Sequence, residues 1–155
     1  MSETLRSRAT GAEALFLLGG LILTVVATQL DWARAGAACA NTEVTRGFGE
    51  STRADPWNWL FFLGAVAAVG SVLVPPRGAL ALELLGAAAS AASLAVLTAL
   101  VTEPFEALRR GAPGSSVGVL CGFDLAVGVW VGGAAVGLLA AAAALRARTA
   151  WHPRA

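Results

Sequence analysis

Two cysteines are the residues of this sequence with the most distinctive chemistry. Cys39 and Cys121 lie far apart along the chain and do not make the C-x-x-C pair that many redox-active thiols have. Three interpretations stay open: a structural disulfide that joins them, two free thiols and, with the least support, a redox pair. A disulfide requires an oxidising compartment, and the topology derived below places both cysteines on the outer side of a membrane.

Two carboxylates, Glu83 and Asp124, lie inside or at the edge of long apolar runs. An ionisable residue within a membrane-spanning segment is a candidate for binding a proton, a cation or a polar substrate group. The simpler interpretation, which we favour, is that each acid reaches its nearest interface or pairs with an arginine. Arg53, Arg109 and Arg110 are the candidate partners of Asp124. Because the two acids lie near opposite membrane faces, the sequence predicts no single site made of both.

The single histidine, His152, lies in a polar tail at the C-terminal end. A metal or haem site needs several ligands, and the sequence offers no set that includes this residue. We also find no nucleotide-binding glycine loop and no pair of nucleophile and base. The sequence therefore predicts no catalytic residue, no cofactor and no metal. We expect a protein that is not an enzyme.

The composition is that of a membrane protein. The 155 residues are 57% hydrophobic and 14% charged, whereas soluble domains carry about 25% charged residues. The net charge of +1 gives no reason to expect a nucleic-acid partner, which would require a basic face. All the basic residues are arginine, which together with the abundant Ala and Gly suggests a bacterial genome rich in GC.

Four long apolar runs predict an all-α fold, an antiparallel bundle of four transmembrane helices in one domain of residues 1–155. The spans cover about residues 13–30, 57–74, 78–101 and 118–145. Pro75 and Pro76 end the second span, and the short turn that follows makes the third span its antiparallel neighbour. The outer loops are residues 31–56, which are long, and 102–117. We assign no strand to the long loop, although a short helix or a hairpin over the bundle is open.

The arginines indicate the orientation of the bundle. Six of them lie on the side that holds both termini and the 75–78 turn, and five are spread over the two longer outer loops. Because cytoplasmic loops carry the higher density of basic residues, we expect a multi-pass protein of the inner (plasma) membrane with both termini in the cytoplasm. The first set is Arg6, Arg8, Arg77, Arg146, Arg148 and Arg154, and the second is Arg34, Arg46, Arg53, Arg109 and Arg110.

Tryptophan side chains prefer the boundary between the membrane and water. Trp32, Trp57 and Trp59 lie next to the outer ends of the first two spans, and Trp151 follows the inner end of the last span. We therefore predict that these four side chains anchor the bundle at its two interfaces. Trp130 lies deeper, where it fills a gap in the bundle, faces lipid, or presents a flat surface to another subunit or ligand.

Small residues are the strongest positive signal of the sequence. Helices in lipid gain little from the hydrophobic effect, so their association depends on close van der Waals contact, which small side chains permit. Gly19 and Gly20 mark such a contact in the first span. The other predicted packing residues are Gly86, Ser90, Gly128, Gly132, Gly133 and Gly137, together with Trp130. Their faces would pack within one bundle or dock a helix of a larger complex.

Three stretches of the sequence are typical of one group of membrane proteins, and the overall layout of the chain is similar as well. These stretches are LDW at 30–32, DPWNWLFFLGAV at 55–66, and GVWVGGAAVGLLAAAAAL at 128–145. With these, the chain resembles small, uncharacterised four-helix membrane proteins of high-GC actinobacteria. The resemblance rests on pattern, and it implies a topology but no activity. Claudin-like bundles also share four spans and a long first outer loop, but of their W…GLW…C…C signature this loop offers only Trp32 and Cys39.

Three functional hypotheses follow. The first is a non-catalytic structural or accessory subunit of a larger bacterial inner-membrane complex, which docks through its small-residue faces and its outer loop. The second is a small transporter or channel-like protein that uses Asp124 or Glu83. The third is a thiol-redox membrane protein that uses Cys39 and Cys121. The expected partners are the lipid bilayer and other membrane subunits.

Overall fold

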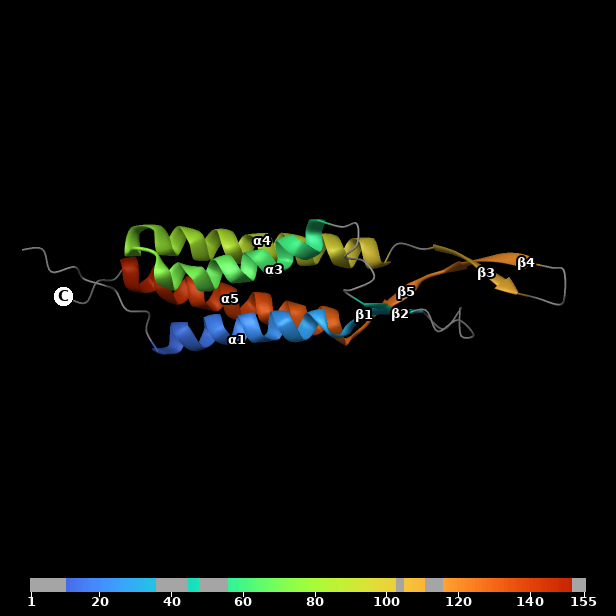
Figure 1. Cartoon of the computed structure of the whole chain (residues 1–155), viewed down its shortest axis with the longest axis horizontal. Helices are drawn as coiled ribbons and strands as arrows, with labels where there is room; N and C mark the ends of the chain where they lie inside the picture. The colour runs from blue at the N-terminus through green and yellow to red at the C-terminus, as the bar shows by residue number, and fades with distance from the viewer. Residues whose placement is uncertain (1–10, 36–44, 48–55, 103–104, 111–115, 152–155) are drawn as a thin grey trace, which may run out of the picture.

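The computed structural model describes residues 11–35, 45–47, 56–102, 105–110 and 116–151. Its main feature is a bundle of four helices that lie side by side along the long axis of the molecule (Figure 1). The helices are α1 (Gly11–Thr28), α3 (Pro56–Gly70), α4 (Pro76–Thr102) and α5 (Val127–Trp151). All four are long and apolar enough to cross a membrane. The predicted bundle of four helices is thus confirmed.

The turn between α3 and α4 is as short as the sequence predicts. Helix α3 begins at Pro56, a favoured first residue because its missing N–H would have no partner there. After Gly70 the chain tightens into the 3₁₀ turn η2 (Ser71–Leu73), and α4 begins at Pro76. The Pro75 carbonyl accepts the N–H groups of residues 78 and 79 at 2.9 and 3.1 Å. This turn makes α3 and α4 antiparallel neighbours.

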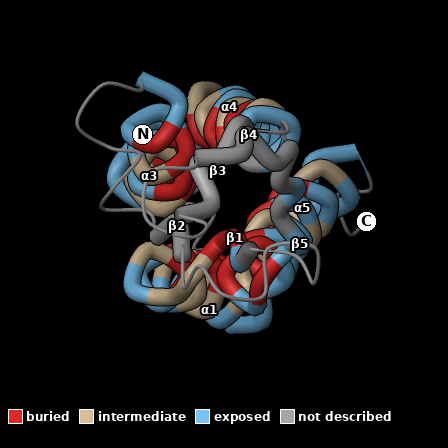
Figure 2. The backbone as a smooth tube through the Cα atoms, turned by 90° about the vertical axis from the view of Figure 1, so that its right-hand side faces the viewer, coloured by how far each residue is buried: buried red, intermediate tan, exposed pale blue. Residues whose placement is uncertain are grey.

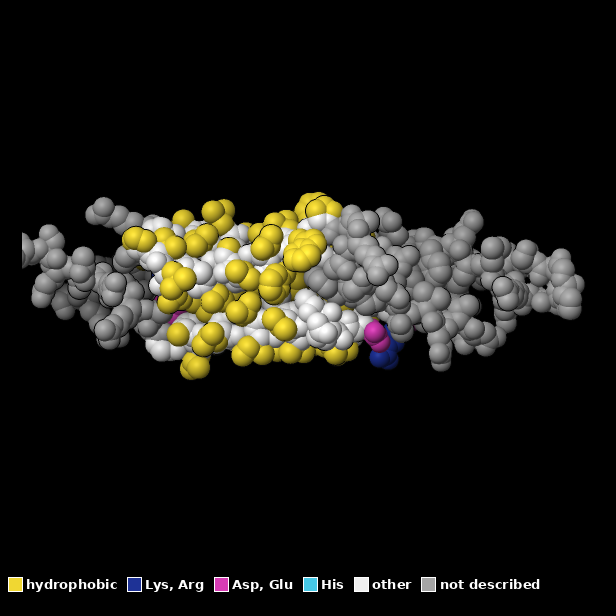
Figure 3. All heavy atoms as spheres, viewed as in Figure 1, with side chains coloured by type: hydrophobic (Ala, Val, Ile, Leu, Met, Phe, Trp, Pro, Cys, Tyr) yellow, Lys and Arg dark blue, Asp and Glu magenta, His cyan; other side chains and the backbone are white. Residues whose placement is uncertain are grey.

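Most of the residues that the helices bury are small, and many of their large apolar residues are exposed. Leu15, Ile22, Leu63 and Leu85 are each more than half exposed, and apolar side chains cover the visible helical surface (Figure 3). On that face the charged side chains of the described residues lie only at the two ends of the helices. Buried segments face the centre of the bundle when it is viewed end-on (Figure 2). An apolar exterior around a core of small residues is typical of helices that pack in lipid.

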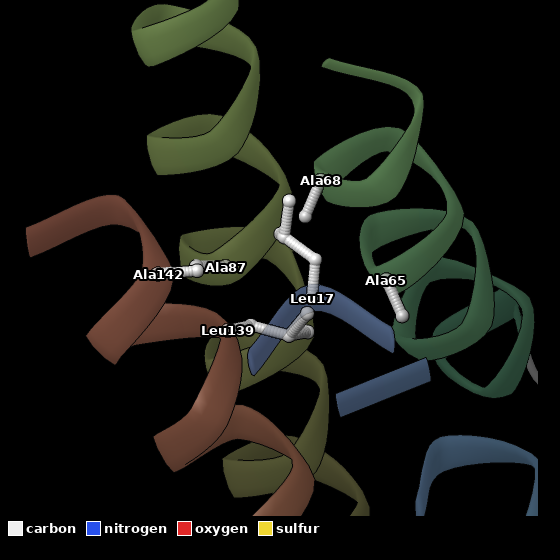
Figure 4. Packing of buried hydrophobic residues seen from close by; sticks show 6 residues of the cluster. All are labelled: Leu17, Ala65, Ala68, Ala87, Leu139 and Ala142. Carbon is white, nitrogen blue, oxygen red and sulfur yellow. The ribbon is translucent and has the colours of Figure 1, made fainter. Parts of the chain in front are cut away.

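Two apolar clusters fill the interior along the bundle. In the first, Leu17 and Leu139 lie between four alanines of α3, α4 and α5 (Figure 4). The second cluster lies nearer the strands and centres on Phe61 and Trp32, whose rings meet edge to face with their centroids 5.7 Å apart. Aromatic pairs prefer this geometry because the positive edge of one ring meets the negative face of the other.

The backbones of α3 and α4 come into close contact at two glycines, Gly64 and Gly86. A Cβ atom on Gly86 would lie 2.5 Å from the Gly64 carbonyl oxygen and 2.7 Å from the Ala68 nitrogen. The hydroxyl of Ser90 donates to the Phe61 carbonyl at 3.0 Å. One turn further along α4, Ser93 donates to the Trp57 carbonyl at 2.8 Å. Backbone contact and two hydroxyl hydrogen bonds therefore hold these helices together.

Helix α1 packs mainly on α5. A Cβ atom on Gly20 would lie 2.7 Å from Cδ2 of Leu139, and one on Gly19 would lie 3.1 Å from Cδ1 of Leu138. These contacts explain the glycine pair in the first span. Helix α5 also contacts α4, so α5 is packed against helices from both halves of the bundle.

Short strands occupy the connections at the end of the bundle opposite the start of α1 and the end of α5 (Figure 1). Strand β1 (Asp31–Ala35) pairs antiparallel with both β2 (Thr45–Gly47) and β5 (Phe123–Leu125). Strands β3 (Phe105–Arg110) and β4 (Ser116–Cys121) form an antiparallel hairpin with Phe105 opposite Cys121.

The sequence prediction assigned no strand to these loops, although it left a short helix or a hairpin open in the first one. The first loop holds part of a small sheet, and the fourth helix begins at Val127, not near residue 118. By hydropathy alone, residues 116–125 are apolar enough to belong to the fourth predicted span. Their alternating valines, however, favour a strand. Hydrophobicity alone cannot separate these two structures in a short apolar segment.

Trp32 is predicted to be an interface anchor, but its side chain is buried inside the bundle. It is only 3% exposed, and its indole N–H donates to the Ala27 carbonyl at 2.7 Å. That carbonyl lies in the last turn of α1, where backbone acceptors have no partner within the helix. The Trp32 carbonyl in turn accepts the N–H of Ala126, just before α5, at 3.0 Å. Trp32 thus fixes the junction of α1, β1 and α5.

Gly86→Ala is expected to lower the free energy of unfolding by about 1–3 kcal/mol, because the new methyl group would push apart the backbones of α3 and α4. Gly70→Ala is the matched control, since a Cβ atom there meets no described atom within 4 Å. Denaturant titration of both variants in detergent measures the difference. Equal stability of the two variants would contradict the close contact at Gly86.

Candidate functional site: a buried cluster of two carboxyls and an arginine

Glu83 is the most deeply buried acid of the described chain, with no exposed surface. It lies in the second turn of α4, close to the turn that joins α3 to α4. The hydroxyl of Ser71, in η2, donates to its Oε1 atom at 2.7 Å. The end of α3 and the start of α4 are therefore joined by a side-chain hydrogen bond inside the bundle.

Arg146 brings a second carboxyl to the same place. Its Nε atom lies 2.8 Å from Oε1 of Glu13 and 2.9 Å from Oε1 of Glu83, and its Nη2 atom also contacts Oε1 of Glu13. The Arg146 side chain is 12% exposed and the Glu13 side chain 4%. One guanidinium from α5 thus binds carboxyls from α1 and α4.

The cluster carries more acid than base. Glu13 and Glu83 face one arginine, and Ser71 adds a neutral donor. The second carboxyl oxygen of Glu83, Oε2, is buried and has no hydrogen-bond partner among the described residues. Burying a carboxylate away from water costs several kcal/mol unless the group is paired and hydrogen-bonded. Removing one partner of a buried ion pair destabilises a protein by about 3–5 kcal/mol. The charge of Glu83 is therefore only partly compensated by the described side chains.

The antiparallel order of the helices brings these residues together. Glu13 lies in the first turn of α1 and Arg146 in the last two turns of α5, so both lie at the end of the bundle where the helical chain begins and ends. Ser71 and Glu83 flank the α3–α4 turn at that same end. The start of α1, the region of the α3–α4 turn and the end of α5 are distant in the sequence, and they converge on one point.

Sequence reasoning found part of this cluster. The sequence predicts that Glu83 either pairs with an arginine or reaches the nearest interface. The structure shows the arginine, Arg146, and the carboxyl of Glu83 is buried. Sequence reasoning did not single out Glu13 or Ser71. The available signal was that Glu13 begins the first span and Arg146 ends the last one, on one side of the predicted topology. Opposite charges placed in this way on two spans are candidates for an ion pair.

Asp124 is not part of this cluster. It lies in β5, at the opposite end of the bundle from Glu83, and its side chain is exposed. Its partner in the β1–β5 register is Arg34, whose side chain also lies 3.5 Å from Asp31. The suggested partners Arg109 and Arg110 lie in β3, and Arg53 lies outside the described residues. The two acids thus form no common site, as the sequence predicts.

Of the two cysteines and the histidine that the sequence analysis considered, the structure describes only one. Cys121 is the last residue of β4, and Cys39 and His152 lie outside the described residues, so the disulfide and the redox pair stay predictions. Within residues 11–35, 45–47, 56–102, 105–110 and 116–151, no three His, Cys, Asp or Glu side chains are grouped closely enough to hold a metal ion.

The two glycine pairs of α5 face different directions. Gly128 and Gly132 are buried, and a Cβ atom on Gly128 would lie 2.7 Å from both the Asp31 carbonyl oxygen and the Trp32 ring. Gly133 and Gly137 are exposed, and a Cβ atom on either would meet no described atom within 4 Å.

Trp130 lies one turn before the exposed glycine pair and is itself 69% exposed, so it does not fill a gap within this bundle. Trp57 and Trp59, at the start of α3, and Trp151, at the end of α5, are exposed as well. These three positions are compatible with the predicted interface anchors.

No protein-family model, curated protein or solved structure matches this chain significantly.

Arg146→Met is expected to lower the free energy of unfolding by about 3 kcal/mol, because it leaves two buried carboxyls without their shared cation. Arg148→Met is the matched control: this arginine lies on the same helix but is exposed, so its loss should change the stability by less than about 0.5 kcal/mol. Unfolding of both variants in detergent tests this. Similar losses in the two variants would show that Arg146 has no special role.

Proposed function

We propose that this chain is a multi-pass protein of a bacterial inner membrane and a non-catalytic, structural or accessory subunit of a larger membrane complex. The lateral surface of the helices supports the membrane location, because its large apolar side chains would be costly to expose to water. We also propose that both termini lie in the cytoplasm, which puts the Glu13–Glu83–Arg146 cluster on the cytoplasmic side. The density of arginines near that end supports it.

The outward face of α5 is the observation that carries the accessory role. We call it the α5 outer face, and it consists of Trp130, Gly133, Gly137, Ala140 and Ala144, which are all exposed. Their spacing of three and four residues places them along one side of the helix. Contact between helices in lipid uses small residues of this kind, and the buried Gly128–Gly132 face already serves the bundle itself.

The occupant that fits this face is a transmembrane helix of another subunit. The open space above Gly133 and Gly137 lets a second backbone approach, and the Trp130 ring offers a flat apolar surface beside it. In the proposed membrane location a soluble partner would not reach this face, since it lies along the apolar length of α5. The strands at the outer end provide a second surface for the same partner complex.

Replacing both Gly133 and Gly137 with Leu should abolish the association while leaving the bundle folded, because the new side chains enter open space and block the approach of a partner helix. Ala88→Leu is the control, since it adds bulk at an exposed position of α4. The tagged protein is purified from its native membrane in mild detergent, and its co-migrating subunits are measured by mass spectrometry. Subunits retained by the double variant, or a wild-type chain that migrates alone, would contradict the docking role.

A second candidate, a small transporter or channel-like protein, draws support from one observation. Glu83 is fully buried and one of its oxygens has no partner among the described residues, which is how an ion-binding acid in a membrane is often placed. Asp124, the other acid considered for this role, is exposed. Proton- or ion-coupled uptake that is lost in Glu83→Gln and kept in Asp124→Asn would favour transport over the accessory role.

The thiol-redox alternative depends on the pair Cys39 and Cys121. Cys121 ends β4, at the end of the bundle that is outside in the proposed orientation, and an oxidising compartment there would favour a disulfide. We expect a structural bridge that changes the electrophoretic mobility of the purified protein on reduction, and a Cys39→Ser variant should lack that shift. Equal mobility of the wild type with and without reductant would remove both the bridge and the redox function.

A further inference from the structure

The cluster of Glu13, Ser71, Glu83 and Arg146 holds more acidic than basic groups, and the proposed docking role does not explain this excess of negative charge. With both acids ionised, two negative charges would face one positive charge within a nearly closed space. Ser71 donates a hydrogen bond to Glu83 but supplies no charge. In an environment of low dielectric constant, a net charge of this kind is unfavourable unless it binds a cation or a proton.

The groups that face Glu83 come from every part of the bundle next to it. They are Glu13 from α1, Ser71 from the end of the α3 segment and Arg146 from α5. Arg146 already contacts the Oε1 atoms of both carboxyls. Oε2 of Glu83, by contrast, is buried and has no described donor, so this atom is where an additional positive group is missing.

A proton suits this position better than a metal ion. Metal ions of the alkali and alkaline-earth type need about six or more oxygen ligands, whereas the described side chains here supply only two carboxyls and one hydroxyl. A proton needs no coordination shell and converts one carboxylate into a neutral acid. The acid that stays ionised then pairs with Arg146 in a neutral ion pair.

We propose that this cluster is a proton-binding site, in which Glu13 and Glu83 together hold one proton and Arg146 neutralises the remaining carboxylate. Arg146 is the most exposed of the three charged side chains, so exchange with the aqueous phase occurs beside it. The proton moves from one carboxyl oxygen to another without any change in the total charge of the cluster. This site is independent of the α5 outer face, because its residues are buried within the bundle.

Infrared spectroscopy tests the proposal directly through the C=O stretching band of a protonated carboxyl. The wild-type protein, reconstituted in lipid at neutral pH without added metal ions, should show one such band. Glu83→Gln and Glu13→Gln should each lose it, because either variant leaves one carboxylate balanced by Arg146. Asp124→Asn, which changes an exposed acid, should keep the band. A wild-type protein without the band, or a band that disappears when sodium ions are added, would overturn the proton site.

Thermal unfolding provides a second test that does not rely on band assignment. Because each single variant keeps a balanced ion pair, Glu83→Gln and Glu13→Gln should have melting temperatures equal to or above that of the wild type. The double variant leaves Arg146 without a carboxylate and should melt at a clearly lower temperature. If either single variant is destabilised as much as the double variant, both acids are ionised in the native protein and the proposal is wrong.

Discussion

The three-way contact of Arg146 with Glu13 and Glu83 is the interaction on which one end of the bundle depends. It joins α5 to α1 and α4, and the hydrogen bond from Ser71 extends it to the α3 segment. The apolar cluster around Leu17 and Leu139 also joins the four helices, but van der Waals contacts do not select a particular partner as paired charges do. In the bilayer that we propose, water cannot compensate buried charges, so these groups must find their partners inside the protein. The contact therefore fixes which helix ends lie together.

The rest of the bundle is held by different means. In its middle, glycine and alanine allow the helix backbones to meet, and the hydroxyls of Ser90 and Ser93 bond to carbonyls of α3. At the far end, Trp32 closes the last turn of α1 and packs against Phe61. In the proposed bilayer these contacts all meet the same need, since helices surrounded by lipid gain little from the hydrophobic effect when they associate. Specific polar contacts at both ends and close packing between them provide the missing stability.

Much of this architecture could be predicted from the sequence, because length and hydropathy determine where a helix can cross a membrane. The short turn at Pro75 and Pro76 indicated the antiparallel α3–α4 pair in the same way. The strands could not be predicted, since residues 116–125 continue an apolar run and differ from a helix only in a weak alternation. The burial of Trp32 was missed because the boundary preference of tryptophan is a statistical rule, which one hydrogen bond to Ala27 overrides.

The buried cluster shows a further limit of the sequence. Glu13 and Arg146 are 133 positions apart, and each alone looks like an ordinary charge at a helix end. Only the packing of α1 on α5 turns them into a pair, and only the α3–α4 turn adds Glu83. Charges that flank different spans on one side of a membrane are thus best considered together, before any of them is assigned to an interface.

The most direct test of this account is a double-mutant cycle between the two acids and Arg146, with stability measured in detergent for the wild type, the Glu13→Gln/Glu83→Gln variant, Arg146→Met and the triple variant. If the arginine balances the carboxylate that the two acids share, its loss should cost less when both acids are already neutral, with a coupling energy of about 1.5–3 kcal/mol. Additive effects, with no coupling between the arginine and the acids, would show that α5 is not joined to α1 and α4 through this contact.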